Sequence, residues 1–89
     1  MRASKDFILR EVAGESLLVP TGAAAARING LITLNELGCF IFKTLQTEQT
    51  PASIAAQIAA EYDVAADAAE VDTLEFLQQL REIGALDEQ

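Results

Sequence analysis

The sequence predicts an α+β fold of the winged helix-turn-helix-like kind, in which a small three-stranded antiparallel sheet is followed by three helices. The spacing of apolar residues supports this fold, because it is about two in the first third of the chain and about 3.6 from Asn35 onward. Turn-forming Gly, Pro and Asn residues also divide the first third into short segments. With 89 residues, we expect a single domain over 1–89.

Two short runs of bulky and β-branched residues predict the first two strands. Phe7–Val12 is the first strand, and it ends at the turn signal Ala13–Glu15. Ser16–Val19 is the second strand, and the turn residues Pro20–Gly22 stop it. We therefore expect these two segments to contribute to the antiparallel sheet.

A third strand is predicted after Asn29-Gly30, which is the strongest short hairpin signal in the chain because both residues can take positive φ. This strand covers Leu31–Leu34. The alanine run before it shows no clear pattern, and Ala25–Ile28 could add a further short strand to the sheet.

Capping residues mark the three predicted helices. Asn35 is a good N-cap for the first helix. Thr50 caps the second helix, with Pro51 at the first helical position. Asp67 is expected to cap the third helix, which runs to Gly84, a typical C′ glycine.

The third helix has an unusually wide apolar face. At about 100° per residue, this face spans roughly 180°, and it carries Leu74, Phe76, Leu77, Leu80 and Ile83. A helix that only covers a core usually shows a stripe about 100–140° wide. The extra width either covers a small core tightly or leaves an apolar shoulder that lines a groove.

Charge is distributed unevenly along the chain. Residues 1–46 carry five basic and four acidic side chains, whereas residues 47–89 carry ten acidic side chains and one basic one, Arg81. Nucleic-acid affinity comes largely from Lys and Arg side chains that neutralise phosphates, so the C-terminal half would repel DNA. The acidic surface could also serve only to keep a small protein in solution.

Catalytic and metal-binding residue types are scarce. The chain has no histidine and one cysteine, which excludes His-based acid–base catalysis and thiolate metal sites. Cys39 lies within a predicted helix, where a packed structural thiol is expected. No apolar run approaches the ~18 residues of a membrane span. We expect a cytoplasmic binding module rather than an enzyme, with no cofactor, metal, nucleic acid or membrane partner.

Several segments, taken in their order, resemble the PqqD-like proteins. These segments are Val12–Ser16, Leu18–Gly22 and Asn29–Gly38, with Thr50, Ile54, Tyr62 and the closing pattern Phe76, Leu77, Leu80, Ile83 and Gly84. The resemblance extends from about Phe7 to Leu86. No single motif is decisive, but the order and spacing together are fairly specific.

This resemblance implies a RiPP recognition element, where RiPP denotes a ribosomally synthesised and post-translationally modified peptide. Such a domain is a peptide chaperone of natural product biosynthesis: it binds the leader segment of a precursor peptide and presents it to a modifying enzyme, often a radical SAM maturase. The resemblance also implies that the leader adds as a strand next to Leu31, Ile32, Thr33 and Leu34, against the third helix. The helix would contribute either Leu74, Leu77 and Arg81 or its other edge, with Phe76 and Ile83. A monomer and a strand-swapped dimer both fit an open sheet edge.

Two alternatives remain at the level of sequence. The three-helix layout also fits a winged-helix DNA-binding regulator, although the acidic third helix lacks the basic side chains of a recognition helix. Salt-dependent binding to duplex DNA would distinguish that regulator from a peptide-binding module. A subunit or scaffold role without a peptide ligand is the other alternative.

Overall fold

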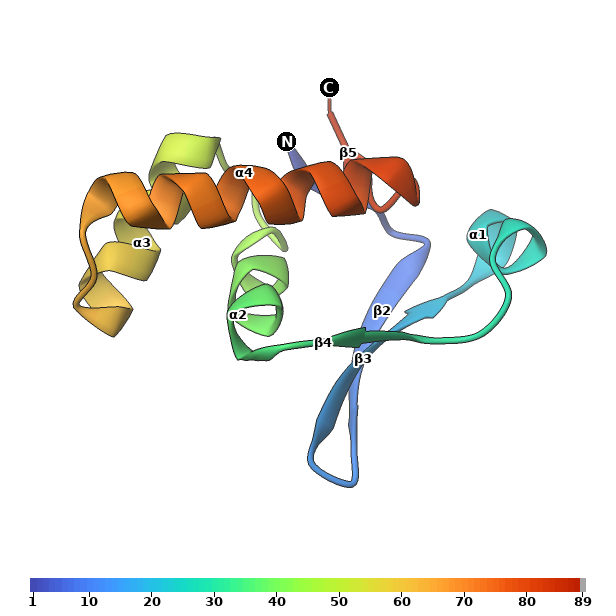
Figure 1. Ribbon diagram of the computed structural model, residues 1–89. Helices are drawn as coiled ribbons and strands as arrows, with labels where there is room; N and C mark the ends of the chain where they lie inside the picture. The colour runs from blue at the N-terminus through green and yellow to red at the C-terminus, as the bar shows by residue number, and fades with distance from the viewer. Residues whose placement is uncertain (89) are drawn as a thin grey trace.

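The computed structural model of the chain describes residues 1–88. Along the chain, the elements are β1 (Arg2–Ala3), β2 (Phe7–Val12), β3 (Glu15–Pro20), α1 (Gly22–Arg27), β4 (Ile32–Leu34), α2 (Glu36–Thr44), α3 (Pro51–Tyr62), α4 (Ala66–Glu82) and β5 (Leu86–Asp87). The predicted α+β class is confirmed, with a three-stranded antiparallel sheet followed by the helices α2, α3 and α4 (Figure 1).

The main sheet has the strand order β2-β3-β4, and both strand pairs are antiparallel. The β2–β3 hairpin turns at Ala13 and Gly14, whose φ values of 53° and 82° are both positive, as a tight hairpin turn requires. β4 pairs with β3 from Ser16↔Leu34 to Leu18↔Ile32. Because β4 is last in the strand order, its other edge has no strand partner among the described residues.

The short strands β1 and β5 form a separate two-stranded sheet that the sequence did not predict. Ala3 pairs with Leu86, and the Ser4 N–H donates a hydrogen bond to the Ala85 carbonyl at 2.9 Å. Strands of two residues carry no alternation of apolar and polar positions, so no periodicity reveals them. This pairing brings the two ends of the described chain together (Figure 1).

The predictions for the segment between the second and third strands are wrong. Ala25–Ile28 is not a strand, because α1 occupies Gly22–Arg27. Alanine has the highest helix propensity, and Ala24 is fully buried against the core, which anchors the helix. Asn29-Gly30 therefore does not close a hairpin, although Gly30 has the expected positive φ of 87° and only Leu31 separates it from β4.

Most of the predicted helix boundaries are confirmed. The Asn35 side chain accepts a hydrogen bond from the Gly38 N–H at 2.7 Å, and Thr50 and Ser53 form a reciprocal capping box. At the other end of the helical region, Gly84 has a φ of 75° and the Ala85 N–H bonds the Leu80 carbonyl, which is a Schellman motif.

One predicted cap is wrong. Asp67 does not cap α4, because the helix begins at Ala66 with Ala65 as its N-cap. The Asp67 carboxylate lies in the first turn instead, where it accepts a hydrogen bond from the Ala68 N–H. An acidic side chain there still complements the positive end of the helix dipole.

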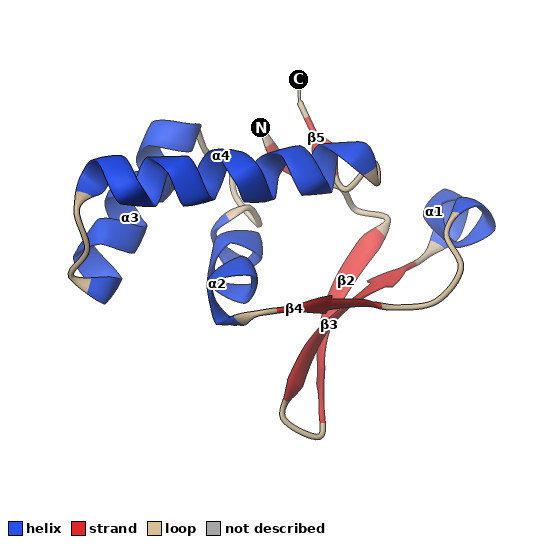
Figure 2. Cartoon of the chain, viewed as in Figure 1, coloured by secondary structure: helices blue, strands red, loops and turns tan. Residues whose placement is uncertain are grey.

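The core lies where α2, α3 and α4 meet the inner face of the sheet. Ile41 and Phe42 of α2 are almost fully buried, and so are Leu77 and Leu80 of α4. Burial of each such side chain contributes roughly 1.5–3 kcal/mol to folding. The helices α2, α3 and α4 thus group on one side, and the β2–β3 hairpin projects away from them, whereas α1 lies apart at the other end of the sheet (Figure 2). Among residues 1–88, no helix is long and apolar enough to cross a membrane.

Candidate functional site

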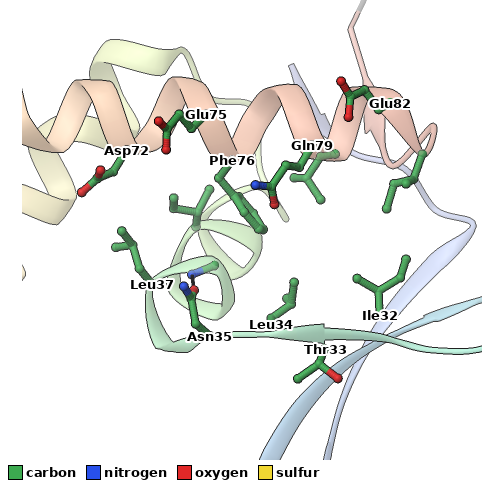
Figure 3. Close-up of a pocket in the computed structure, with 14 residues that line it drawn as sticks. Ile32, Thr33, Leu34, Asn35, Leu37, Asp72, Glu75, Phe76, Gln79 and Glu82 are labelled. Carbon is green, nitrogen blue, oxygen red and sulfur yellow. Dashed lines mark hydrogen bonds between the residues drawn. The ribbon is translucent and has the colours of Figure 1, made fainter.

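A groove of about 580 Å³ lies between β4 and α4 (Figure 3). It is lined by residues from β4, the start of α2 and one side of α4, namely Ile32, Thr33, Leu34, Asn35, Leu37, Gly38, Ile41, Asp72, Glu75, Phe76, Gln79, Leu80, Glu82 and Ile83. One wall is therefore a strand with an open edge, and the other is the face of a long helix.

The strand wall offers backbone groups to a ligand. Ile32 and Leu34 point toward α4, whereas Thr33 points away from it (Figure 3). This alternation follows from the period of two in a strand. The edge of β4 that does not pair with β3 presents free N–H and C=O groups, and such an edge can take up a further strand.

The helix wall combines apolar and acidic side chains. Phe76 and Ile83 are half-buried, and they contribute the apolar surface. Asp72, Glu75 and Glu82 are exposed and lie along the same side of α4. An extended ligand in the groove could therefore contact apolar side chains on the wall and carboxylates along its rim.

Gly38 determines where the Phe76 ring lies. A Cβ atom at position 38 would lie 2.8 Å from Cε1 of Phe76, which is closer than van der Waals contact allows. The absence of a side chain in this turn of α2 lets the ring rest on the helix backbone. Gly38 was not among the predicted site residues, and a glycine inside a helix was the signal that could have indicated it.

The structure brings together four of the eight predicted peptide-binding residues. Ile32, Thr33, Leu34 and Phe76 all line the groove. Leu31 precedes β4, is 58% exposed and lies outside the groove lining.

The other three predicted residues lie elsewhere on α4. Leu77 is 1% exposed and belongs to the core, so its side chain is not accessible to a ligand. Leu74 is 50% exposed but does not line the groove. Arg81 is also outside the lining, and its guanidinium donates to both carboxylate oxygens of Glu88, at 2.8 and 2.9 Å. Of the two edges of α4 that the sequence allows, the groove contains the one with Phe76 and Ile83.

The groove lining is negatively charged. Among the described residues, the lining includes three carboxylates and no Lys or Arg side chain. Within residues 1–88, the ion pairs are Met1–Glu48 and Arg81–Glu88, and neither involves the groove. The Arg81 guanidinium, which hydrogen-bonds Glu88, holds the pKa of the Glu88 carboxyl below its usual value.

A second hollow, of about 440 Å³, lies between the β2–β3 hairpin and the helices, and Cys39 and Tyr62 are among its lining residues. The Cys39 thiol is buried and accepts a hydrogen bond from the Ser16 hydroxyl at 3.4 Å, as a structural thiol would. Desolvation, followed by the nearby Glu36 carboxylate, raises the pKa of the Tyr62 hydroxyl. Among residues 1–88, no group of three or more His, Cys, Asp and Glu side chains is arranged to hold a metal.

Comparison with known proteins gives one family match and two similar structures. The family model described as coenzyme PQQ synthesis protein D (PqqD) matches residues 15–86. No curated protein matches the chain. A structure described as TbiB1 in complex with the TbiA(beta) leader peptide has a TM-score of 0.79 and 24% identity, over 100% of this chain and 98% of that one.

The second structure is described as a lasso peptide synthetase B1 complexed with the leader peptide. It has a TM-score of 0.74 and 23% identity, over 94% of this chain and 93% of that chain. At these identities, the similarity establishes a shared fold over nearly the full length of each chain.

Proposed function

The chain belongs to the PqqD family, and we propose that it binds the leader segment of a ribosomally synthesised precursor peptide and presents it to a modifying enzyme. The observation that carries this proposal is the open edge of β4, which lies beside a groove with an apolar wall on α4. An extended peptide would add to β4 as a further strand of the main sheet.

The physical basis is β-augmentation. Hydrogen bonds between the peptide backbone and the free edge of β4 supply affinity for any extended peptide. Specificity then comes from the side chains that enter the groove beside Ile32, Leu34 and Phe76. A leader peptide loses conformational freedom when it binds, so we expect moderate affinity.

The two similar structures support a peptide ligand. Each is described as a complex with a leader peptide, and each shares the fold of this chain over almost its whole length. The family match covers β3, β4 and all of α4, which are the elements that build the groove.

We further propose that the protein acts without catalysis of its own, in the cytoplasm, as a partner of a radical SAM or other maturation enzyme. The chain has no histidine, and its single thiol is buried. A general base hydrogen-bonded to Cys39 would be needed to activate it, and the hydrogen bond of its sulfur to a side chain within residues 1–88 is with the Ser16 hydroxyl. Binding and presentation therefore account for the groove better than chemistry does.

DNA binding fits the molecule less well. In a winged helix-turn-helix protein, the recognition helix enters the major groove of DNA with basic and amide side chains. The corresponding helix here presents Asp72, Glu75 and Glu82 along its groove side. These carboxylates would repel the phosphate backbone.

The proposal is tested by titrating isotopically labelled protein with synthetic peptides that correspond to short reading frames next to its own. We expect one such peptide to shift the amide signals of β4 and of the groove side of α4. If none of them shifts β4 amides at high-micromolar concentration, the proposal is wrong.

A pair of matched variants tests which edge of α4 contacts the peptide. Phe76→Ala removes the largest apolar side chain of the helix wall, and we expect it to weaken the affinity for that peptide by about 1–3 kcal/mol. Leu74→Ala removes an exposed apolar side chain from the same helix outside the groove, so the affinity should stay within about 0.5 kcal/mol of the unmodified protein. Equal losses in both variants would contradict the proposed edge.

A further inference from the structure

We propose that the groove selects leader segments that carry two basic side chains four residues apart, with an apolar side chain midway between them. This inference rests on the proposed function, because it assumes that the peptide adds as a strand to β4. It specifies the chemistry of the peptide from the positions of the charged and apolar groups on α4.

The carboxylates of the groove form a line parallel to the path of the peptide. α4 runs above β4 in the opposite direction, with Asp72 toward the Leu37 end of the groove and Glu82 toward the Ile32 end (Figure 3). A strand that adds to the open edge of β4 would therefore lie along this line. Glu75 lies one helical turn from Asp72, so these two carboxylates act together at the first end.

The carboxylates are available to a ligand. Asp72, Glu75 and Glu82 are exposed, and none of them takes part in an ion pair within residues 1–88. Glu82 accepts a long hydrogen bond of 3.4 Å from Gln78, which leaves its charge uncompensated. Arg27 lies beside Gly84, beyond the end of the groove, and does not pair with Glu82.

The separation of the two ends sets the spacing in the peptide. With a rise of about 1.5 Å per residue, the midpoint between Asp72 and Glu75 lies about 13 Å along α4 from Glu82. An extended peptide covers that distance in about four residues at about 3.3 Å each. Residues separated by four point to the same face of a strand, so both basic side chains can face α4 at once.

The position between the two basic residues faces the apolar part of the wall. Alternate side chains of the added strand face α4, so the residue midway between the basic pair also does. That part of the helix presents Phe76, together with Gln79, between the acidic ends (Figure 3). An aliphatic or aromatic side chain fits there because it can pack on the Phe76 ring.

The size of the effect follows from the exposure of the groups. Water and salt screen an exposed ion pair. Each such pair therefore raises the affinity for the peptide by a factor of only about 1.4 to 5. We therefore expect the two ends together to contribute about tenfold at low salt, and less when salt is added.

The test is a selection of random peptides of about twelve residues on three forms of the protein. The first is the unmodified protein, and the second carries Asp72→Asn, Glu75→Gln and Glu82→Gln in the groove. The third carries Glu61→Gln, Asp63→Asn and Glu70→Gln, which are exposed and lie outside the groove. Each variant removes three negative charges, so the second and third forms have the same net charge.

We expect peptides enriched on the unmodified protein and on the third form to carry Lys or Arg at two positions four apart, around an apolar residue. The enrichment should disappear on the second form, and an enriched peptide should bind that form about tenfold more weakly at low salt. Circular dichroism checks that all three forms are folded.

The outcomes separate this inference from the proposed function. If enriched peptides shift β4 amides but show no basic pair, or lose the same affinity on both variants, the charge rule is wrong and the proposed function stands. If no enriched peptide shifts β4 amides, the proposed function is wrong and the inference falls with it.

Discussion

At the scale of single residues, the groove depends on one close contact between two helices. Gly38 of α2 leaves room for the Phe76 ring of α4, and a methyl group there would overlap the ring. A glycine inside a helix usually costs about 1 kcal/mol relative to alanine. The Phe76 ring explains why a glycine stands at position 38, because any side chain there would push the ring, and with it the wall of the groove, out of place.

The contact between Gly38 and Phe76 is testable by a double-mutant cycle. Gly38→Ala should change the free energy of unfolding about 0.5–3 kcal/mol more favourably in the Phe76→Ala background than with Phe76 present, because the ring is absent and Asn35 Oδ1, 3.1 Å from the added Cβ, is the nearest remaining neighbour. With Phe76 present, the same substitution should bring less stability and should weaken peptide binding. Chemical denaturation measures the change in each background, and equal changes in the two backgrounds would show that the ring does not contact position 38.

A second residue-scale prediction concerns the exposed pair of Arg81 and Glu88. Because the hydrogen bond from Arg81 lowers the pKa of the Glu88 carboxyl, the pair stabilises the fold above the ordinary pKa of a glutamate. This contribution is lost as the pH falls through the lowered pKa. Arg81→Gln should therefore raise the Glu88 pKa, which carboxyl ¹³C shifts measure during a pH titration.

The same variant tests the boundary of the groove. Arg81 lies outside the groove lining, so Arg81→Gln should leave the affinity for a bound peptide unchanged. A clear loss of affinity would instead place Arg81 in the binding surface, as the sequence had suggested.

At the scale of elements, local signals in the sequence predict some parts of the fold well and others not at all. Capping residues act on their own helix, so Asn35, Thr50 and Gly84 could be recognised directly. α1 was missed because the local sequence fits both a strand and a short alanine-rich helix. Packing of Ala24 into the core, which is not a local signal, favours the helix. The pairing of β1 with β5 joins distant segments, which no local signal can reveal.

The cap of α3 gives a prediction at this scale. Thr50→Ala removes the oxygen that accepts from the Ser53 N–H at 3.0 Å, so the free energy of unfolding should fall by about 1 kcal/mol. Thr47→Ala is the matched control, because its exposed hydroxyl caps no helix: it donates a long 3.4 Å hydrogen bond to the Thr44 carbonyl and accepts one of 3.0 Å from the Gln49 side chain. Denaturant midpoints compare the two variants, and equal losses would mean that the capping box contributes nothing specific.

At the scale of the whole molecule, the groove joins parts of the chain that are far apart in sequence. Residues 32–34 form one wall and residues 72–83 the other, and the packed core between them fixes their separation. The strand wall and Phe76 could be named from the sequence through its resemblance to a family. Which edge of α4 faces β4 could not, because the apolar face of that helix is wide enough to serve the core, the groove and an exposed shoulder with Leu74.

The central claim, that a leader peptide pairs with the free edge of β4, is tested most directly by hydrogen exchange in the bound state. The outer edge of β2 is the internal control, because it is the other edge of the same sheet. When a peptide binds, the amides of residues 32–34 that point away from β3 should exchange more slowly, and those on the outer edge of β2 should not change. Saturation with peptide without added protection in β4 would contradict the claim.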